Sequence, residues 1–507
     1  MPLEYLEFEC QMTCEGSKTQ FWPRPSAYQL PLRRTARPRH DYARPIPMGE
    51  ETLQGPIMAS TTEHIVTVVD NSLVCTSDVG AERKIHLDDV VCILRNPAPE
   101  SGYSVLFLEK GESDDVNFPG RLVTTEIPSL PASLTRFVAE VPSHLRQGDA
   151  VQVVISTQSG TGTAQLVFDH IVQPFLTSLG LDHQIHRTQS AQTVTELSQA
   201  QFLVSACSGI PQTILLLSGD GALADIIGVF YNSARPIETP PNIALIPCGT
   251  GNAMASSIGL RTGPASGLAV LLQGQPAPVP IFVAKLSSGS QLVTDQGRQR
   301  APIDAQSHGS HHIMYGGVVA SWGLHAALVA DSDTSEYRKF GSERFKMAAN
   351  ELLYPSDNAG PHRFQGRISF TTSDHQTGNR REETIADDEH MYVLATLVPR
   401  LEREFLISPA SEPLGGQLRL LRFGPLPPEE AMRLMTLAYQ GGQHVEEQMV
   451  TYTEVERVRI EFQEEHERWR RVCIDGTIVA VERGGWLELY KEPRQLLRVI
   501  HHPSQCK

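Results

Sequence analysis

The sequence lacks a hydrophobic run long enough to cross a membrane. Its longest apolar stretch, residues 316–330, is interrupted by Ser321 and His325 and is shorter than the ~20 residues that a spanning helix needs. The eight cysteines are scattered, without a CxxC pair or a secretory segment before them, which favours a reducing compartment over a disulfide framework. We therefore expect a cytoplasmic protein without a transmembrane helix.

Positive charge is also scarce overall. The chain has 43 Lys+Arg against 58 Asp+Glu, a formal net charge of −15, so its average field repels nucleic acids. In residues 21–56, however, prolines alternate with arginines and aliphatic periodicity is nearly absent. We predict that residues 1–60 form a disordered Pro/Arg-rich arm, which is either a solvated tail or a basic arm that touches anionic lipid.

The 507 residues are enough for two or three domains. Short β-rich runs separated by turn residues predict a small β-rich N-terminal domain over residues 61–145. Apolar strands then alternate with glycine loops and helical segments, which predicts an α/β domain with a parallel, doubly wound sheet over residues 150–275. From residue 276 to 495 the β-runs return and predict a second β-rich domain.

Three glycine-rich loops each follow an apolar strand of the predicted α/β domain. They are Ser-Gly-Thr-Gly-Thr at 159–163, Ser-Gly-Asp-Gly at 218–221 and Pro-Cys-Gly-Thr-Gly-Asn at 247–252. Loops at the carboxyl ends of parallel strands offer backbone N–H groups and helix N-termini to phosphate. Neither the third glycine of GxGxxG nor the sequence GxxxxGK[ST] occurs at these loops, which excludes a Rossmann dehydrogenase and a P-loop NTPase.

A carboxylate stands in the middle of the second loop, at Asp220, where phosphate binding alone would gain nothing from it. An acid beside bound phosphates can orient Mg²⁺ or accept the proton of an attacking hydroxyl. Asp225 follows, ~1.5 helical turns further along. It is either a carboxylate that shares a metal–water network with Asp220 or a solvated helix residue.

In this order, the three loops resemble the catalytic domain that diacylglycerol kinases and sphingosine kinases share. The resemblance continues at 321–323 (Ser-Trp-Gly), Asp331, 336–345 (Glu-Tyr-Arg-Lys-Phe-Gly-Ser-Glu-Arg-Phe), 441–444 (Gly-Gly-Gln-His) and 474–476 (Ile-Asp-Gly). It covers about residues 150–492. Asn-Ala-Met-Ala after the third loop looks more like the sphingoid-base branch than the Asn-Asp-Phe of many diacylglycerol kinases.

The resemblance implies an ATP- and Mg²⁺-dependent lipid kinase in peripheral contact with a membrane, with a C-terminal β-sandwich domain that holds the lipid. It implies that Asp220 is the general base and that Asp331 meets the ammonium of a sphingoid head group. It assigns the nucleotide to Ser156, Gly160, Gly162, Thr188, Ser218, Gly219, Gly221, Gly249, Thr250, Gly251, Asn252, Arg338, Arg344, Asp475 and Gly476.

Three departures from the family pattern keep alternatives open. At the end of the first strand, Ser156-Thr157 stands where the family commonly has Asn-Pro, and Thr161 and Thr163 stand where lysines are common. Thr477 replaces the glutamate of Asp-Gly-Glu. The span from Trp322 to Tyr337 is slightly longer than the common sphingosine-kinase spacing. We favour a sphingoid-base kinase. The alternatives are a diacylglycerol kinase, whose substrate has no cation for Asp331 to pair with, and a pseudokinase that binds lipid or nucleotide without turnover.

Overall fold

The structure is a computed structural model. It describes residues 65–76, 82–96, 102–109, 120–146, 151–160, 162–260, 264–303, 311–341, 343–357, 359–374 and 377–502. The predicted Pro/Arg-rich arm, residues 1–60, lies outside the described residues. Within the described ranges, no helix is both long and apolar enough to span a bilayer.

The N-terminal β-rich region consists of two antiparallel three-stranded sheets, in the orders β1-β2-β3 and β4-β5-β6. Their strands are β1 (Ile65–Val69), β2 (Ser72–Thr76), β3 (Glu82–His86), β4 (Val90–Arg95), β5 (Tyr103–Glu109) and β6 (Arg121–Ile127), with the short helices η1 (Leu87–Asp89), η2 (Ala132–Phe137) and α1 (Ser143–Arg146). Both sheets contribute to one core that includes Leu73, Ile85, Val105 and Phe107. The expected β-rich segment is therefore present.

A six-stranded sheet forms the centre of the next region, in the order β11-β27-β10-β9-β7-β8. Its strands are β7 (Val151–Ile155), β8 (His183–Arg187), β9 (Thr213–Ser218), β10 (Asn242–Pro247), β11 (Gln275–Pro278) and β27 (Arg498–His501). All pairings are parallel except that of β11 with β27. β7 and β9 are buried along their whole length, which explains their continuous apolar sequences.

Helices connect the parallel strands of this sheet. They are α2 (Ala164–Val167), η3 (Phe168–Val172) and α3 (Gln173–Ser178) after β7; α4 (Thr193–Leu197), η4 (Ser198–Phe202) and α5 (Leu203–Cys207) after β8; α6 (Asp220–Asn232) after β9; and α7 (Ala253–Ser257) and α8 (Pro264–Gln273) after β10. The strand order reverses direction between β7 and β9. Since crossovers are right-handed, the helices that follow these two strands cover opposite faces and leave a crevice above the strand ends.

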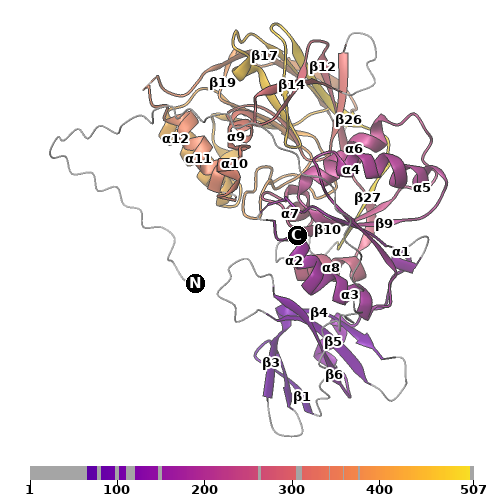
Figure 1. The fold of residues 1–507 in the computed structure, drawn as a ribbon. Coiled ribbons are helices and arrows are strands. Elements are labelled where there is room, and N and C mark those ends of the chain that lie inside the picture. The colour runs from indigo at the N-terminus through magenta and orange to yellow at the C-terminus, as the bar shows by residue number, and fades with distance from the viewer. Residues whose placement is uncertain are drawn as a thin grey trace, which may run out of the picture. The chain divides into compact units, whose positions relative to one another are not determined.

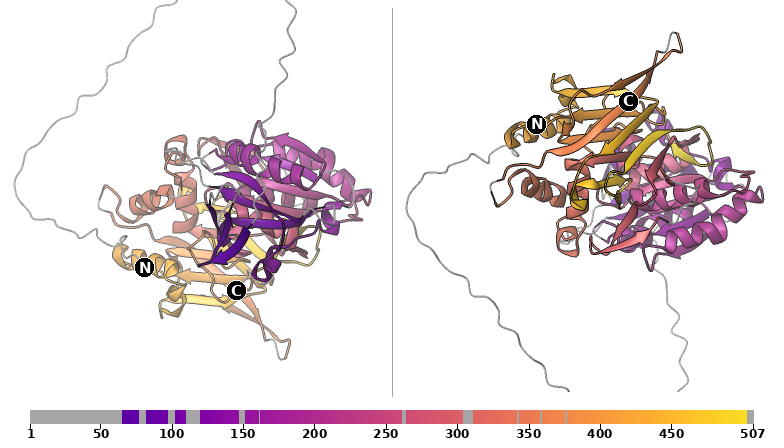
Figure 2. Two further views of the ribbon diagram at one scale, coloured as in Figure 1. Left: turned by 90° about the horizontal axis from the view of Figure 1, so that it is seen from below. Right: turned by 90° about the horizontal axis from the view of Figure 1, so that it is seen from above.

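The second β-rich region is a pair of sheets (Figures 1 and 2). One contains β12 (Ile281–Ser287), β15 (His311–Gly316), β17 (Phe364–Ser373), β18 (Arg380–Thr384), β19 (Glu389–His390), β23 (Arg457–Phe462) and β26 (Trp486–Glu492). The other contains β13 (Gln291–Thr294), β14 (Gln299–Pro302), β16 (Val319–Gly323), β20 (Tyr392–Thr396), β21 (Arg419–Phe423), β22 (Val450–Glu454), β24 (Arg471–Ile474) and β25 (Thr477–Ala480). A shared apolar core around Trp322 packs them face to face.

The strand pattern alone did not predict the helices of this region. They are α9 (Leu324–Ser332), α10 (Ser335–Arg338), α11 (Glu343–Leu353), α12 (Pro428–Tyr439), η5 (Gln443–Glu446) and η6 (Glu467–Arg470). α9 and α11 pack against each other beside the sandwich (Figure 1). The sandwich is joined to the parallel sheet by β27, which returns to pair with β10, and by the Tyr231 hydroxyl, which donates to the Arg494 carbonyl at 3.0 Å.

Candidate active site

The three glycine loops meet at the carboxyl ends of β7, β9 and β10. Where β7 ends, the Ser156 hydroxyl donates to the Ser218 hydroxyl at 2.7 Å. The Thr157 amide donates to the Thr188 hydroxyl at 3.1 Å, which ties the end of β7 to the end of β8. The Gly219 amide donates to the Ser159 hydroxyl at 3.1 Å. The loops at the reversal point of the strand order are therefore cross-linked by their own side chains.

Close backbone packing requires glycine at two positions of these loops. Gly160 has φ +57°, and a Cβ atom on it would lie 2.4 Å from the Cys248 carbonyl oxygen. A Cβ atom on Gly249 would lie 2.4 Å from the Gly219 Cα atom. Any larger residue would push the loops apart. The first, second and third loops thus form one continuous backbone surface of the kind that holds phosphate groups.

The remaining loop residues predicted to bind nucleotide lie on or beside this surface. Gly162 has φ +77° and lies near the Thr157 carbonyl; Gly221 lies in the first turn of α6 with open space around it; and Gly251 faces the Leu401 carbonyl. Thr250 is half-buried in the third loop. Asn252 adopts a left-handed conformation with φ 52° and bonds Gly249 through both ends of its side-chain amide, at 2.9 and 2.7 Å.

Asp220, within the second loop, is also the first residue of α6. Its carboxylate accepts the backbone amides of Ala253 at 2.7 Å and Met254 at 3.0 Å, so it caps the N-terminus of α7. Burial raises the pKa of Asp220, and these amide donors oppose the rise. A carboxylate that is fixed in place and has a raised pKa suits a general base.

Asp475 precedes the tight turn at Gly476, which has φ +87°. Its carboxylate accepts three backbone amides, from Gly317 at 2.6 Å, Val318 at 3.0 Å and Val319 at 2.7 Å. Burial raises the pKa of Asp475 to about 6, and the charge of Asp220 adds to the rise. Asp475 therefore holds the turn that leads into β16 and brings a second carboxylate close to Asp220.

These two carboxylates fit the needs of Mg²⁺ better than Asp225 does. Mg²⁺ beside nucleotides takes one or two carboxylates and completes its shell with water and phosphate. Asp220 and Asp475 accept amides but keep unused lone pairs. Asp225 instead bonds the Thr195 side chain of α4, and burial raises its pKa to about 7. No cluster of three or more metal-ligating side chains occurs in the described ranges.

Arg338 and Arg344 converge on Asp333, in the acidic turn after α9. Their guanidinium groups lie 2.9 Å and 3.6 Å from its Oδ1 atom. In the part of the chain that the structure describes, the Nε atom of Arg344 is buried without a hydrogen-bond partner. A buried, unused guanidinium donor fits a phosphate oxygen.

Asp333, the partner of both arginines, and Asp475 act on the same buried thiol. Cys473 is buried, which raises its pKa to about 12, and the charges of Asp475 and Asp333 add to the rise. Asp333 therefore lies within electrostatic range of Cys473, two residues before Asp475. The same region carries Asp475, whose pKa responds to Asp220. The charges of Asp333, Asp475 and Asp220 are thus linked through the pKa values of Cys473 and Asp475.

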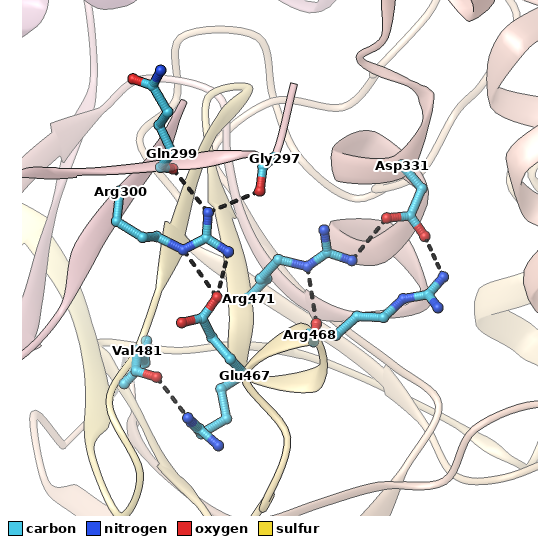
Figure 3. Close-up of polar contacts among 9 residues, drawn as sticks. Gly297, Gln299, Arg300, Asp331, Glu467, Arg468, Arg471 and Val481 are labelled. Atoms are coloured by element: carbon cyan, nitrogen blue, oxygen red, sulfur yellow. Dashed lines mark hydrogen bonds and ion pairs between the residues drawn. The ribbon is translucent and has the colours of Figure 1, made fainter. Parts of the chain in front are cut away.

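Asp331, the predicted head-group residue, lies in the last turn of α9 and is bracketed by two arginines (Figure 3). Arg468 Nη2 donates to its Oδ2 atom and Arg471 Nη2 to its Oδ1 atom, each at 2.8 Å. Sequence reasoning missed both arginines. The only local signal is the Arg-Trp-Arg-Arg run shortly before Asp475, and nothing in it indicates a partner more than a hundred residues away.

The comparison with known families matches the loops described above. Residues 150–284 match the family model of the diacylglycerol kinase catalytic domain. This segment is therefore similar to that catalytic domain. The matched range includes all three glycine loops and Asp220, and it ends in β12. The predicted family is therefore confirmed, whereas the roles of the individual residues remain predictions.

Similar proteins extend the likeness beyond the catalytic domain. Sphingosine kinase B of Dictyostelium discoideum is 25% identical over 187 residues, 36% of this chain and 22% of that protein. Sphingosine kinase 2 of Homo sapiens is 24% identical over 243 residues, 45% of this chain and 31% of that protein. The matches thus span less than a third of these relatives. A solved diacylglycerol kinase from Bacillus anthracis covers 70% of this chain and 98% of its own, at 14% identity and a TM-score of 0.41.

Proposed function

We propose that this protein is a lipid kinase that transfers the γ-phosphoryl group of ATP to the primary hydroxyl of a sphingoid long-chain base. The observation that carries the proposal is the carboxylate of Asp220, held by two helix amides beside three interlocked glycine loops. A base fixed next to a phosphate-binding surface is what phosphoryl transfer to an alcohol requires.

In the proposed reaction the phosphates of ATP lie on the glycine loops, and the lipid hydroxyl approaches Asp220. The hydroxyl gives its proton to the Asp220 carboxylate as its oxygen bonds to the γ-phosphorus, and the bond from that phosphorus to the β–γ bridging oxygen breaks. Arg344 offers its unpartnered Nε donor to the charge that develops on the transferred group. Mg²⁺ would supply charge neutralisation, with Asp475 as the carboxylate that would hold it while Asp220 acts as the base.

Two features favour a sphingoid base over diacylglycerol. Asp331 offers a carboxylate to cations, and the relatives reported above are named sphingosine kinases. Diacylglycerol, which the name of the family model suggests, is the second candidate. It has no amine, so it gains nothing from a carboxylate at the head-group position.

We also propose peripheral contact with a membrane, where such a lipid resides. Phe340, Met347 and Tyr354 are 55%, 38% and 45% exposed and follow one another at intervals of seven residues along the segment around α11. Met347 lies in α11, Phe340 in the turn before it and Tyr354 directly after it, so three exposed apolar side chains lie along and beside this helix. Lys339 and Lys346 stand next to two of them and can meet anionic lipid headgroups.

The experiment that tests the function is transfer of labelled phosphate from ATP, with Mg²⁺, to sphingosine and to diacylglycerol in mixed micelles. Asp220→Asn is the matched control, because asparagine keeps an oxygen for capping α7 but cannot take a proton. We expect product on sphingosine and a fall in kcat of at least about a hundredfold in the variant. Product on diacylglycerol alone would favour the second candidate, and nucleotide binding without product would indicate a pseudokinase.

A further inference from the structure

Arg468 occupies a place that a cation from outside could take. Its guanidinium forms an ion pair with Asp331 Oδ2 at 2.8 Å and lies over the ring of Trp469, 4.7 Å from the centroid. A carboxylate combined with an aromatic face is the usual pair of groups that bind an alkylammonium. The protein thus has a cation site that its own side chain fills.

The two arginines at Asp331 are held very differently. The Arg471 side chain is 10% exposed and is fixed a second time, because its Nε atom donates to the Arg468 carbonyl at 3.0 Å. The Arg468 side chain is 56% exposed. An exposed ion pair contributes little to stability, whereas separating a buried one is costly. Arg468 can therefore leave Asp331 easily, and Arg471 cannot.

The backbone that carries Arg468 is anchored on both sides, so only its side chain needs to move. Glu467 accepts the Arg300 Nε atom at 2.9 Å, and Arg470 Nε donates to the Val481 carbonyl at 2.9 Å (Figure 3). Trp469, between them, also lines a small cavity with Leu324, Leu353 and Phe364. The 56% exposed side chain of Arg468 can therefore swing away from Asp331 while its neighbours hold the backbone in place.

We propose that Arg468 is an internal competitor for the amine of the substrate, and that Arg471 is a positioning residue that keeps Asp331 in place. The ammonium of a long-chain base displaces Arg468 from Oδ2 and from the Trp469 ring, while Arg471 stays on Oδ1. This inference rests on the proposed function for its substrate. It adds a specificity-determining residue, Arg468, and a positioning residue, Arg471. A cation that binds Asp331 more weakly than Arg468 does is kept out of the site.

Opposite effects of the two arginines test the proposal. Removing Arg468 should tighten sphingosine binding about three- to fivefold, the factor that one exposed ion pair represents. Arg468→Ala and Arg468→Gln should both show it. Arg471→Ala should weaken sphingosine binding, and Arg471→Lys should restore part of it. Arg483→Ala is the matched control, since Arg483 is 72% exposed and pairs with Glu465 at 2.7 Å.

Binding and turnover are measured separately on the full chain, binding by quenching of tryptophan fluorescence with sphingosine and turnover by phosphate transfer. In an Asp331→Asn background the Arg468→Ala change should have no further effect. If Arg468→Ala leaves sphingosine affinity unchanged or weakens it, the competitor role is wrong even when the kinase is active. If affinity rises but the wild-type protein transfers no phosphate to sphingosine, the proposed function fails and the competitor role stands.

Discussion

Replacing Asp225 with asparagine should stabilise the protein at high pH, because the wild-type carboxylate is ionised there in a buried position. Burial raises its pKa from 3.8 to about 7, against a hydrogen bond from Thr195 that an asparagine oxygen can still accept. At ~1.36 kcal/mol per pKa unit, a rise of that size means that ionised Asp225 lowers the free energy of unfolding by at most about 4 kcal/mol. Since Asp225 keeps some contact with solvent, we expect Asp225→Asn to be about 2 kcal/mol more stable than the wild type at pH 8.

The size of this effect depends on pH. Below about pH 4 the carboxyl is protonated in the folded and the unfolded chain, so Asp225 contributes its full stability there, and that stability is lost as the pH rises toward 7. The gap between variant and wild type should therefore grow from near zero at pH 4 to its full size at pH 8.

Urea unfolding of the full chain, followed from pH 4 to 8, measures this difference in stability. Asp169→Asn is the control, because Asp169 is exposed and accepts from the Gln165 side chain. Parallel stability curves for wild type and Asp225→Asn would refute the reasoning from burial. Stabilisation of the wild type by Mg²⁺ at pH 8 that Asp225→Asn abolishes would instead support the metal role suggested by the sequence.

Two further predictions concern the loops and the membrane. Gly249→Ala should destabilise the protein by about 1–3 kcal/mol in thermal melts and raise the KM for ATP, because its Cβ atom would meet Gly219. Gly228→Ala is the control: it lies in open space within α6 and should be neutral or stabilising. Phe340→Ser combined with Met347→Ser should reduce sedimentation with anionic vesicles without changing turnover of micellar substrate; unchanged sedimentation would place membrane contact elsewhere.

The glycine loops could be predicted from the sequence because their chemistry is local. Each loop follows its own strand, and the glycines that the packing requires, Gly160 and Gly249, lie within short motifs. The role of Asp220 as a cap was not predictable, because its amide partners come 33 and 34 residues later, from a helix whose position depends on the sheet order.

The environment of Asp331 was still less accessible to sequence reasoning. Its arginine partners lie 137 and 140 residues away and arrive on η6 and β24 after the chain has built most of the sandwich. Asp333, two positions from Asp331, proved to bind Arg338 and Arg344. Two carboxylates in one acidic turn thus have different arginine pairs, and only the folded sandwich distinguishes them.

The position of β27 has a consequence for synthesis. β27 lies between β10 and β11, so the sheet that carries the glycine loops lacks an inner strand until residues 498–501 have left the ribosome. At about 5–20 residues per second, the wait while the second domain is translated is on the order of ten seconds or more. During that time β10 presents an unpaired edge, which is prone to aggregation. Nascent chains would thus need protection at this edge. Proteolytic loss of 498–501 would remove an inner strand of the sheet and so disturb the glycine loops that the sheet carries.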